Sequence, residues 1–118
     1  MYKYHNQNPL ELLTDDCTVR AISMAEDTTW DNTYDKLSDL AQQYGTLLND
    51  RNFIISYLDN NYYRLPINNM TVGEVAGRFR DNILLITMRS HITVSKYGII
   101  YDLFDCRDTP VEHVWVVK

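Results

Sequence analysis

The sequence is poor in cysteine, proline and glycine, and it has no long apolar segment. Its 118 residues include two Cys, three Pro and four Gly. Two cysteines are too few for a disulfide scaffold, and with three scattered His they lack the spacing of a structural zinc site. No apolar run reaches the roughly 18 residues of a membrane span, and the polar N-terminus does not resemble a signal peptide. We therefore expect a cytoplasmic protein with free thiols and no metal or organic cofactor.

Basic residues are also scarce, with 11 Lys and Arg against 16 Asp and Glu, for a formal net charge of −5. A protein that binds nucleic acid through phosphate contacts needs a positive surface, so this balance argues against a nucleic-acid partner. Hydrophobic residues make up 45 % of the chain, which is enough for one core. We expect a single domain over residues 1–118 that binds a peptide, a protein substrate or a host protein, and no membrane.

The spacing of apolar residues predicts helices in the first two thirds of the chain. Residues 1–13 have the pattern of an extended lead-in and residues 59–70 that of a loop, because Pro and Asn interrupt them. In the segments between 14 and 58 and after 70, apolar residues recur at steps of three and four. Each of these segments follows a residue of a type that favours helix N-caps. The predicted helices cover about 14–26, 29–44, 50–58 and 71–79, with caps expected at Thr14, Asp15 or Asp16, at Thr28 or Thr29, at Asn49 or Asp50, and at Thr71.

From residue 82 onward the pattern changes to that of strands. Residues 82–88 are an apolar run, residues 91–96 alternate, and residues 99–104 return after a Tyr97-Gly98 turn. Residues 111–117 predict a last strand. The sequence therefore predicts an α+β fold, in which a helical part (about 14–80) packs on a C-terminal antiparallel sheet (about 82–117).

The predicted hairpin places His91 near a carboxylate. A two-residue turn at Tyr97-Gly98 puts Thr93 opposite Asp102, so that Asp102 becomes a diagonal neighbour of His91 on the same face, about 7–8 Å between backbones. Asp105 then points to the other face. A turn longer by one residue would exchange the two aspartates, because a shift of one residue reverses the faces.

Cys17 stands at the start of the first predicted helix, where free amides and the helix dipole favour a thiolate. The acidic Asp15 and Asp16 oppose a second negative charge, whereas a cationic His91 would favour it. Asp102 would orient the imidazole, and the backbone N–H of Cys17 can contribute to an oxyanion hole. The plainer alternative is a small buried cysteine behind two capping aspartates, with Arg20 in an ordinary helix ion pair to Asp16.

Two blocks of this sequence carry a resemblance that covers most of the chain. One is Asp16-Cys17-Thr18-Val19-Arg20-Ala21-Ile22, and the other is His91-Ile92-Thr93-Val94 followed by Gly98-Ile99-Ile100-Tyr101-Asp102 and Asp105-Cys106. They resemble the cysteine and histidine–aspartate segments of papain-like and bacteriocin-processing peptidases, and in particular a family of small, phage-borne papain-like proteins. The resemblance implies a papain-like fold and a thiol hydrolase with three catalytic residues: Cys17 as nucleophile, His91 as base and Asp102 as orienting group.

The sequence departs from that pattern at the oxyanion hole. Such enzymes usually carry a Gln about six residues before the cysteine, and Glu11 stands there. An ionised Glu accepts hydrogen bonds and cannot donate one to an oxyanion. Gln7, Asn6 or Asn8 could take this role if the lead-in folds over Cys17.

Two functions from different classes therefore follow. The first is a cysteine peptidase or amidase with Cys17, His91 and Asp102 as its triad. The second is a non-catalytic phage accessory protein that keeps the fold and inhibits a host protein, which the Glu11 departure and the acidic charge favour. A redox pair of Cys17 and Cys106 is a third alternative and requires backbones about 4.4–6.8 Å apart.

Overall fold

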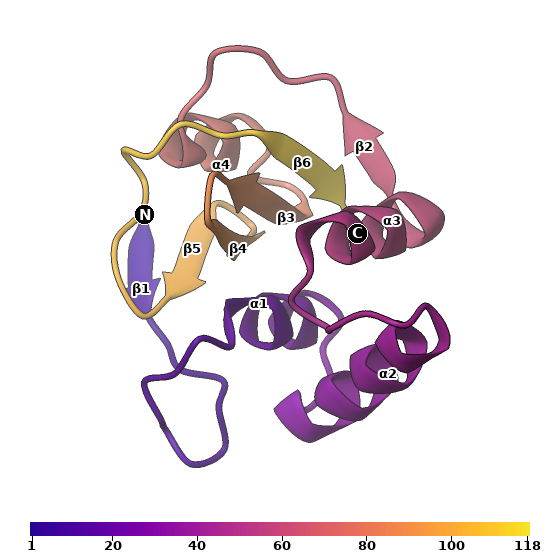
Figure 1. Ribbon diagram of the computed structural model, residues 1–118. Coiled ribbons are helices and arrows are strands. Elements are labelled where there is room, and N and C mark those ends of the chain that lie inside the picture. Colours follow the sequence, from indigo (N-terminus) through magenta and orange to yellow (C-terminus); the bar gives the residue numbers. More distant parts are fainter.

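Four helices and one six-stranded sheet make up the chain, which the computed structural model describes over residues 1–118 (Figure 1). This arrangement confirms the α+β class. The helices are α1 (Cys17–Ala25), α2 (Trp30–Gln43), α3 (Arg51–Asn61) and α4 (Val72–Arg78), and none of them is long and apolar enough to cross a membrane. The strands are β1 (Tyr2–Tyr4), β2 (Tyr63–Leu65), β3 (Ile83–Met88), β4 (His91–Lys96), β5 (Ile99–Asp102) and β6 (His113–Val116).

The sheet is mixed, with the strand order β1-β5-β4-β3-β6-β2. The expectation of a purely C-terminal, antiparallel sheet is wrong at both edges. Strand β1 comes from the predicted lead-in and pairs parallel to β5, while β2 comes from the predicted loop and pairs antiparallel to β6. Each edge strand has only three residues. Distant strands provide the hydrogen-bond partners of their backbone groups. Three residues are also too few to show the alternating pattern by which a strand is recognised in a sequence.

Three of the four helices begin at a predicted cap. Thr29 accepts a hydrogen bond from the backbone N–H of Asn32, and Asp50 accepts one from that of Phe53. Thr71 forms a full capping box at the start of α4. These contacts join residues three apart in the sequence, which is why local reasoning finds them.

Helices cover both faces of the sheet (Figure 1). Alternate residues of β3 belong to different core clusters: Leu85 packs with α1, α2 and α3, whereas Leu84 and Ile86 pack with α4. All six residues of β3 are buried for this reason. Helix α1 lies directly against β4 and β3, between the sheet and α2, and its first residue lies beside the first residues of β4.

The β4–β5 hairpin has the predicted register. Lys96 pairs with Ile99, and the ladder continues to Val94 opposite Tyr101. Tyr97 and Gly98 both have positive φ, at 54° and 87°, as a two-residue turn of type I′ requires. This register brings Asp102, at the end of β5, beside the first residue of β4.

Candidate functional site

The residues predicted to act together, Cys17, His91 and Asp102, form a connected group in the structure. The imidazole Nε2 of His91 lies 2.7 Å from Oδ2 of Asp102, across the two strands of the hairpin. The other neighbour of His91 is the sulfur of Cys17, which comes from the first residue of α1. The imidazole of His91 therefore lies between a thiol and a carboxylate, and it is hydrogen-bonded to the carboxylate.

The imidazole shifts the charge of the thiol beside it. Burial raises the pKa of Cys17, but hydrogen bonds to His91 and to the backbone N–H of Ile92 outweigh burial, so the thiol pKa lies below its usual value. Burial likewise disfavours the charged form of His91, yet Asp102 and Cys17 together raise the pKa of His91 to about 9. Both shifts favour a thiolate beside an imidazolium at neutral pH.

Asp102 is buried and held from four directions. In addition to His91, its carboxylate accepts from Arg20 Nη1 at 3.3 Å and from the backbone N–H of Leu103 at 2.7 Å. The Cys106 sulfur lies 3.9 Å from its Oδ2. Burial raises the pKa of Asp102, but the hydrogen bond and the charge of His91 lower this pKa by more than burial raises it. The pKa of Asp102 therefore lies below its ordinary value. Asp102 is therefore an anion that fixes the orientation of the imidazole.

Sequence reasoning missed the parts that Arg20 and Cys106 take. The Arg20–Asp16 pair was expected on a helix surface, but it is buried and Arg20 also reaches Asp102. Cys106 is only 2 % exposed, and burial followed by the Asp102 charge raises its pKa to about 11. It is therefore a neutral thiol that donates to Asp102. The one local signal was the four-residue spacing of Asp16 and Arg20.

The expected capping role of Asp16 is wrong. Asp16 occupies the N-cap position of α1, but its side chain makes no cap hydrogen bond. Its carboxylate instead accepts from Arg20 Nε at 2.7 Å, Trp30 Nε1 at 2.9 Å and Asn8 Nδ2 at 3.1 Å. The backbone N–H of Cys17, in the first turn of α1, has no acceptor in the hydrogen-bond network and remains a free donor beside the sulfur.

The lead-in folds back over α1, but only one of its amide side chains lies beside the thiol. Gln7 lines a small cavity together with Cys17, where its Oε1 lies 2.7 Å from His5 Nε2 and its Nε2 donates to the Thr28 carbonyl. Asn8 instead binds Asp16. Glu11 is exposed and has a positive φ of 54°. No lead-in amide therefore donates towards Cys17, whereas the backbone N–H of Cys17 is a free donor next to the sulfur, and the side-chain amide of Asn49 lines the same cavity as Cys17.

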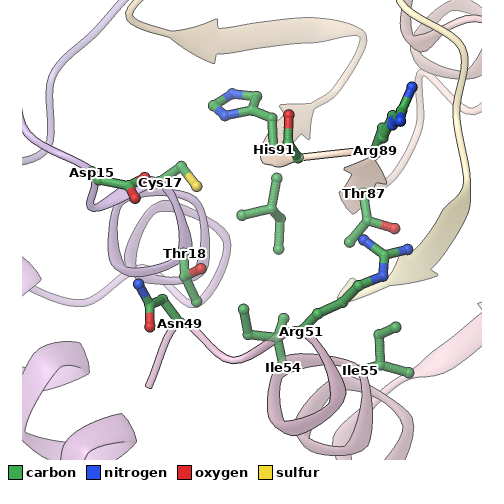
Figure 2. A pocket seen from close by; sticks show the side chains of 12 residues that line it. Asp15, Cys17, Thr18, Asn49, Arg51, Ile54, Ile55, Thr87, Arg89 and His91 are labelled. Carbon is green, nitrogen blue, oxygen red and sulfur yellow. The ribbon is translucent and has the colours of Figure 1, made fainter. Parts of the chain in front are cut away.

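A cavity of about 180 Å³ opens next to Cys17 and His91 (Figure 2). Its lining comes from the start of α1, the first turns of α3 and the β3–β4 connection. The Cys17 sulfur and the His91 ring lie on adjoining sides of it, so a bond to be attacked can enter from solvent.

Three side chains behind the thiol offer metal-ligand atoms, since atoms of His91, Asp102 and Cys106 lie within 4.8 Å of one another. Zinc binds cysteine as a thiolate. The raised pKa of Cys106, about 11, keeps its sulfur protonated, and His91 Nε2 is already bonded to Asp102. The group is better suited to internal hydrogen bonding than to holding a metal.

Two sequence alternatives, Asp105 as the partner of His91 and a disulfide between the two cysteines, are absent from the structure. Asp105, the alternative partner of His91, is exposed and paired with Arg107 at 2.8 Å. Cys17 and Cys106 are both free thiols.

Compared with known proteins, the chain matches no family model, no curated protein and no solved structure.

Proposed function

We propose that this protein is a papain-like cysteine hydrolase, a peptidase or amidase with Cys17 as nucleophile, His91 as acid and base, and Asp102 as orienting group. The observation that carries this proposal is the connected order of the three groups, with His91 between a thiol of lowered pKa and a carboxylate at 2.7 Å. The pKa of the His91 imidazole beside this cysteine is raised to about 9. Strongly shifted pKa values gather at functional sites, which favours a catalytic role over that of an ordinary buried cysteine.

The reaction proceeds in two steps that return every group to its starting state. The Cys17 thiolate attacks the carbonyl carbon of an amide, and the resulting oxyanion accepts a hydrogen bond from the free backbone N–H of Cys17. The carbon–nitrogen bond breaks as the His91 imidazolium gives its proton to the leaving amine. Water then loses a proton to neutral His91 and attacks the thioester, which releases the carboxylic acid and restores the thiolate.

Asp102 acts through His91 in both steps. As an anion it stabilises the imidazolium and fixes the ring so that one nitrogen serves Asp102 while the other serves sulfur and substrate. Arg20 keeps this carboxylate charged inside the protein, since its Nη1 lies 3.3 Å from Asp102.

The papain-like assignment rests on the arrangement of the elements. A cysteine at the first residue of a helix, with histidine and aspartate from neighbouring strands, is the order that the resembling peptidases use. Helix α1 packs against the strand that carries the histidine, as expected for that fold. A phage origin and action in the host cytoplasm follow from the same resemblance and remain part of the proposal.

The test is cleavage of a proteome-derived peptide mixture, with new termini read by mass spectrometry. Wild-type protein should generate new termini, and Cys17→Ala should generate none while retaining its circular dichroism spectrum. Asp102→Asn should lower the rate by about 10²–10⁴, the scale of general acid–base catalysis. Asp105→Asn is the matched control, because that carboxylate faces Arg107. Cleavage by Cys17→Ala would exclude the mechanism.

The second candidate is a non-catalytic protein of the same fold that binds and inhibits a host protein. The lead-in favours it, because Glu11 is exposed, Gln7 donates to Thr28, and neither side chain donates towards Cys17. If this reading holds, Cys17→Ala retains the phenotype that the wild-type protein causes in a host cell. Loss of that phenotype in a folded Cys17→Ala variant favours the hydrolase.

A further inference from the structure

The cavity beside the thiol has apolar walls and a cationic end. Ile54, Ile55 and Ile92 contribute apolar walls, and both Cys17 and Arg51 line the same cavity. Figure 2 shows the Arg51 side chain rising from α3 towards Thr87, on the side of the cavity away from Cys17. An extended group that passes from the sulfur along these walls therefore ends at a guanidinium.

Arg51 has N–H donors that no protein group accepts from. A guanidinium carries five N–H donors, and Arg51 uses Nη2 for Glu112 at 2.5 Å and Nη1 for the Met88 carbonyl at 3.5 Å. The side chains of Arg51 and Glu112 are 46 % and 40 % exposed, so water and ions compete with this pair. A substrate carboxylate can bind the remaining donors or replace Glu112, because both present the same oxygen pair.

The charges of the lining residues point the same way. Arg89 stands at the outer rim and takes part in no ion pair, while Asp15, the one acidic lining residue, lies at the Cys17 end. The far end of the cavity is thus positive in a chain whose formal net charge is −5. Positive charge at the end of a cleft with apolar walls raises the local concentration of anionic ligands.

We propose that the cavity is a specificity site for acidic peptides, in which Arg51 binds a glutamate or aspartate side chain close to the amide that Cys17 attacks. This inference rests on the proposed hydrolase function and names its substrate class. The isoleucines accept the methylene groups of the acidic side chain, and Arg51 receives its carboxylate. A lysine at the same position would place like charges together.

The test uses two sets of three tripeptide fluoromethyl ketones. Within each set the peptides differ only in Glu, Gln or Lys, which stands at one of the two positions before the ketone. The Cys17 thiolate displaces fluoride from the terminal carbon, so a carbon–sulfur bond replaces the carbon–fluorine bond. Mass spectrometry of the intact protein gives each labelling rate, and iodoacetamide serves as the uncharged reference reagent. We expect the Glu probe to label fastest at one position, roughly tenfold faster than the Lys probe, with a difference that shrinks at high salt.

Variants identify the residue responsible. Arg51→Gln should bring the ratio of the Glu to the Gln rate towards one, and Arg51→Glu should favour the Lys probe. Arg107→Gln is the matched control, because this arginine does not line the cavity, and it should keep the wild-type ratio. The comparison of probes in wild-type protein stands even if an Arg51 variant does not fold.

The outcomes separate this inference from the function on which it rests. Rapid labelling by iodoacetamide with equal rates for Glu, Gln and Lys overturns the acidic specificity and leaves the hydrolase standing. Slow labelling of Cys17 by every reagent shows that the thiol is not activated and overturns both.

Discussion

Replacement of Arg20 by methionine tests the buried charge network that supports the site. The Arg20 side chain is 9 % exposed, and it lies between the carboxylates of Asp16 and Asp102, whose side chains are 6 % and 3 % exposed. Methionine keeps most of the volume and the helix propensity but removes the positive charge. Two buried carboxylates then lose their shared cation.

The expected loss is large. Removing one partner of a buried ion pair costs about 3–5 kcal/mol, because the other charge stays buried without compensation. Domains are stable by only about 5–15 kcal/mol, so Arg20→Met should lose a substantial share of its unfolding free energy. The same change should raise the pKa of Asp102 and weaken the hydrogen bond between Asp102 and His91.

Urea denaturation measures this loss as a lower midpoint with an unchanged slope. Arg107→Met is the matched control, since its partner Asp105 is exposed, and its midpoint should stay close to that of the wild type. A loss below about 1 kcal/mol for Arg20→Met, the value typical of exposed pairs, would refute the claim that this network is buried and obligatory.

Two further predictions concern His91. The pKa of His91 is raised to about 9 in the folded protein and is about 6.5 when unperturbed, so its stabilising charge is fully present below pH 6.5 and is lost as the pH rises through about 9. The difference in unfolding free energy between wild type and His91→Gln should therefore be greatest near pH 6 and shrink by pH 10; a constant difference would contradict the assigned shift. Asp102→Asn should lower the pKa of His91 in an NMR titration, because the hydrogen bond and charge that raise it are removed, and an unchanged pKa would show that Asp102 is not its main partner.

Much of this fold was predictable because its signals are local. The caps at Thr29, Asp50 and Thr71 join residues three apart, and the type I′ turn at Tyr97-Gly98 sets the hairpin register. From that register alone, Asp102 rather than Asp105 could be placed beside the start of β4. The bond between His91 and Asp102 follows from turn geometry.

The rest depends on contacts between distant segments. Strand β1 pairs with β5 nearly a hundred residues later, and three residues are too few to carry a periodic pattern. The capping prediction for Asp16 was wrong because Arg20 and Trp30 compete for its carboxylate after folding. The burial of Cys106 against Asp102 likewise needs the whole sheet.

The most direct test of the central claim is the rate of Cys17 alkylation by iodoacetamide as a function of pH. The measurement uses Cys106→Ala protein, so that a single thiol reacts, with and without His91→Ala. Because His91 lowers the pKa of Cys17, the account predicts a reactive thiol well below pH 8 that loses this reactivity when His91 is removed. An inflection near the ordinary cysteine value of about 8.5 in both proteins would contradict it.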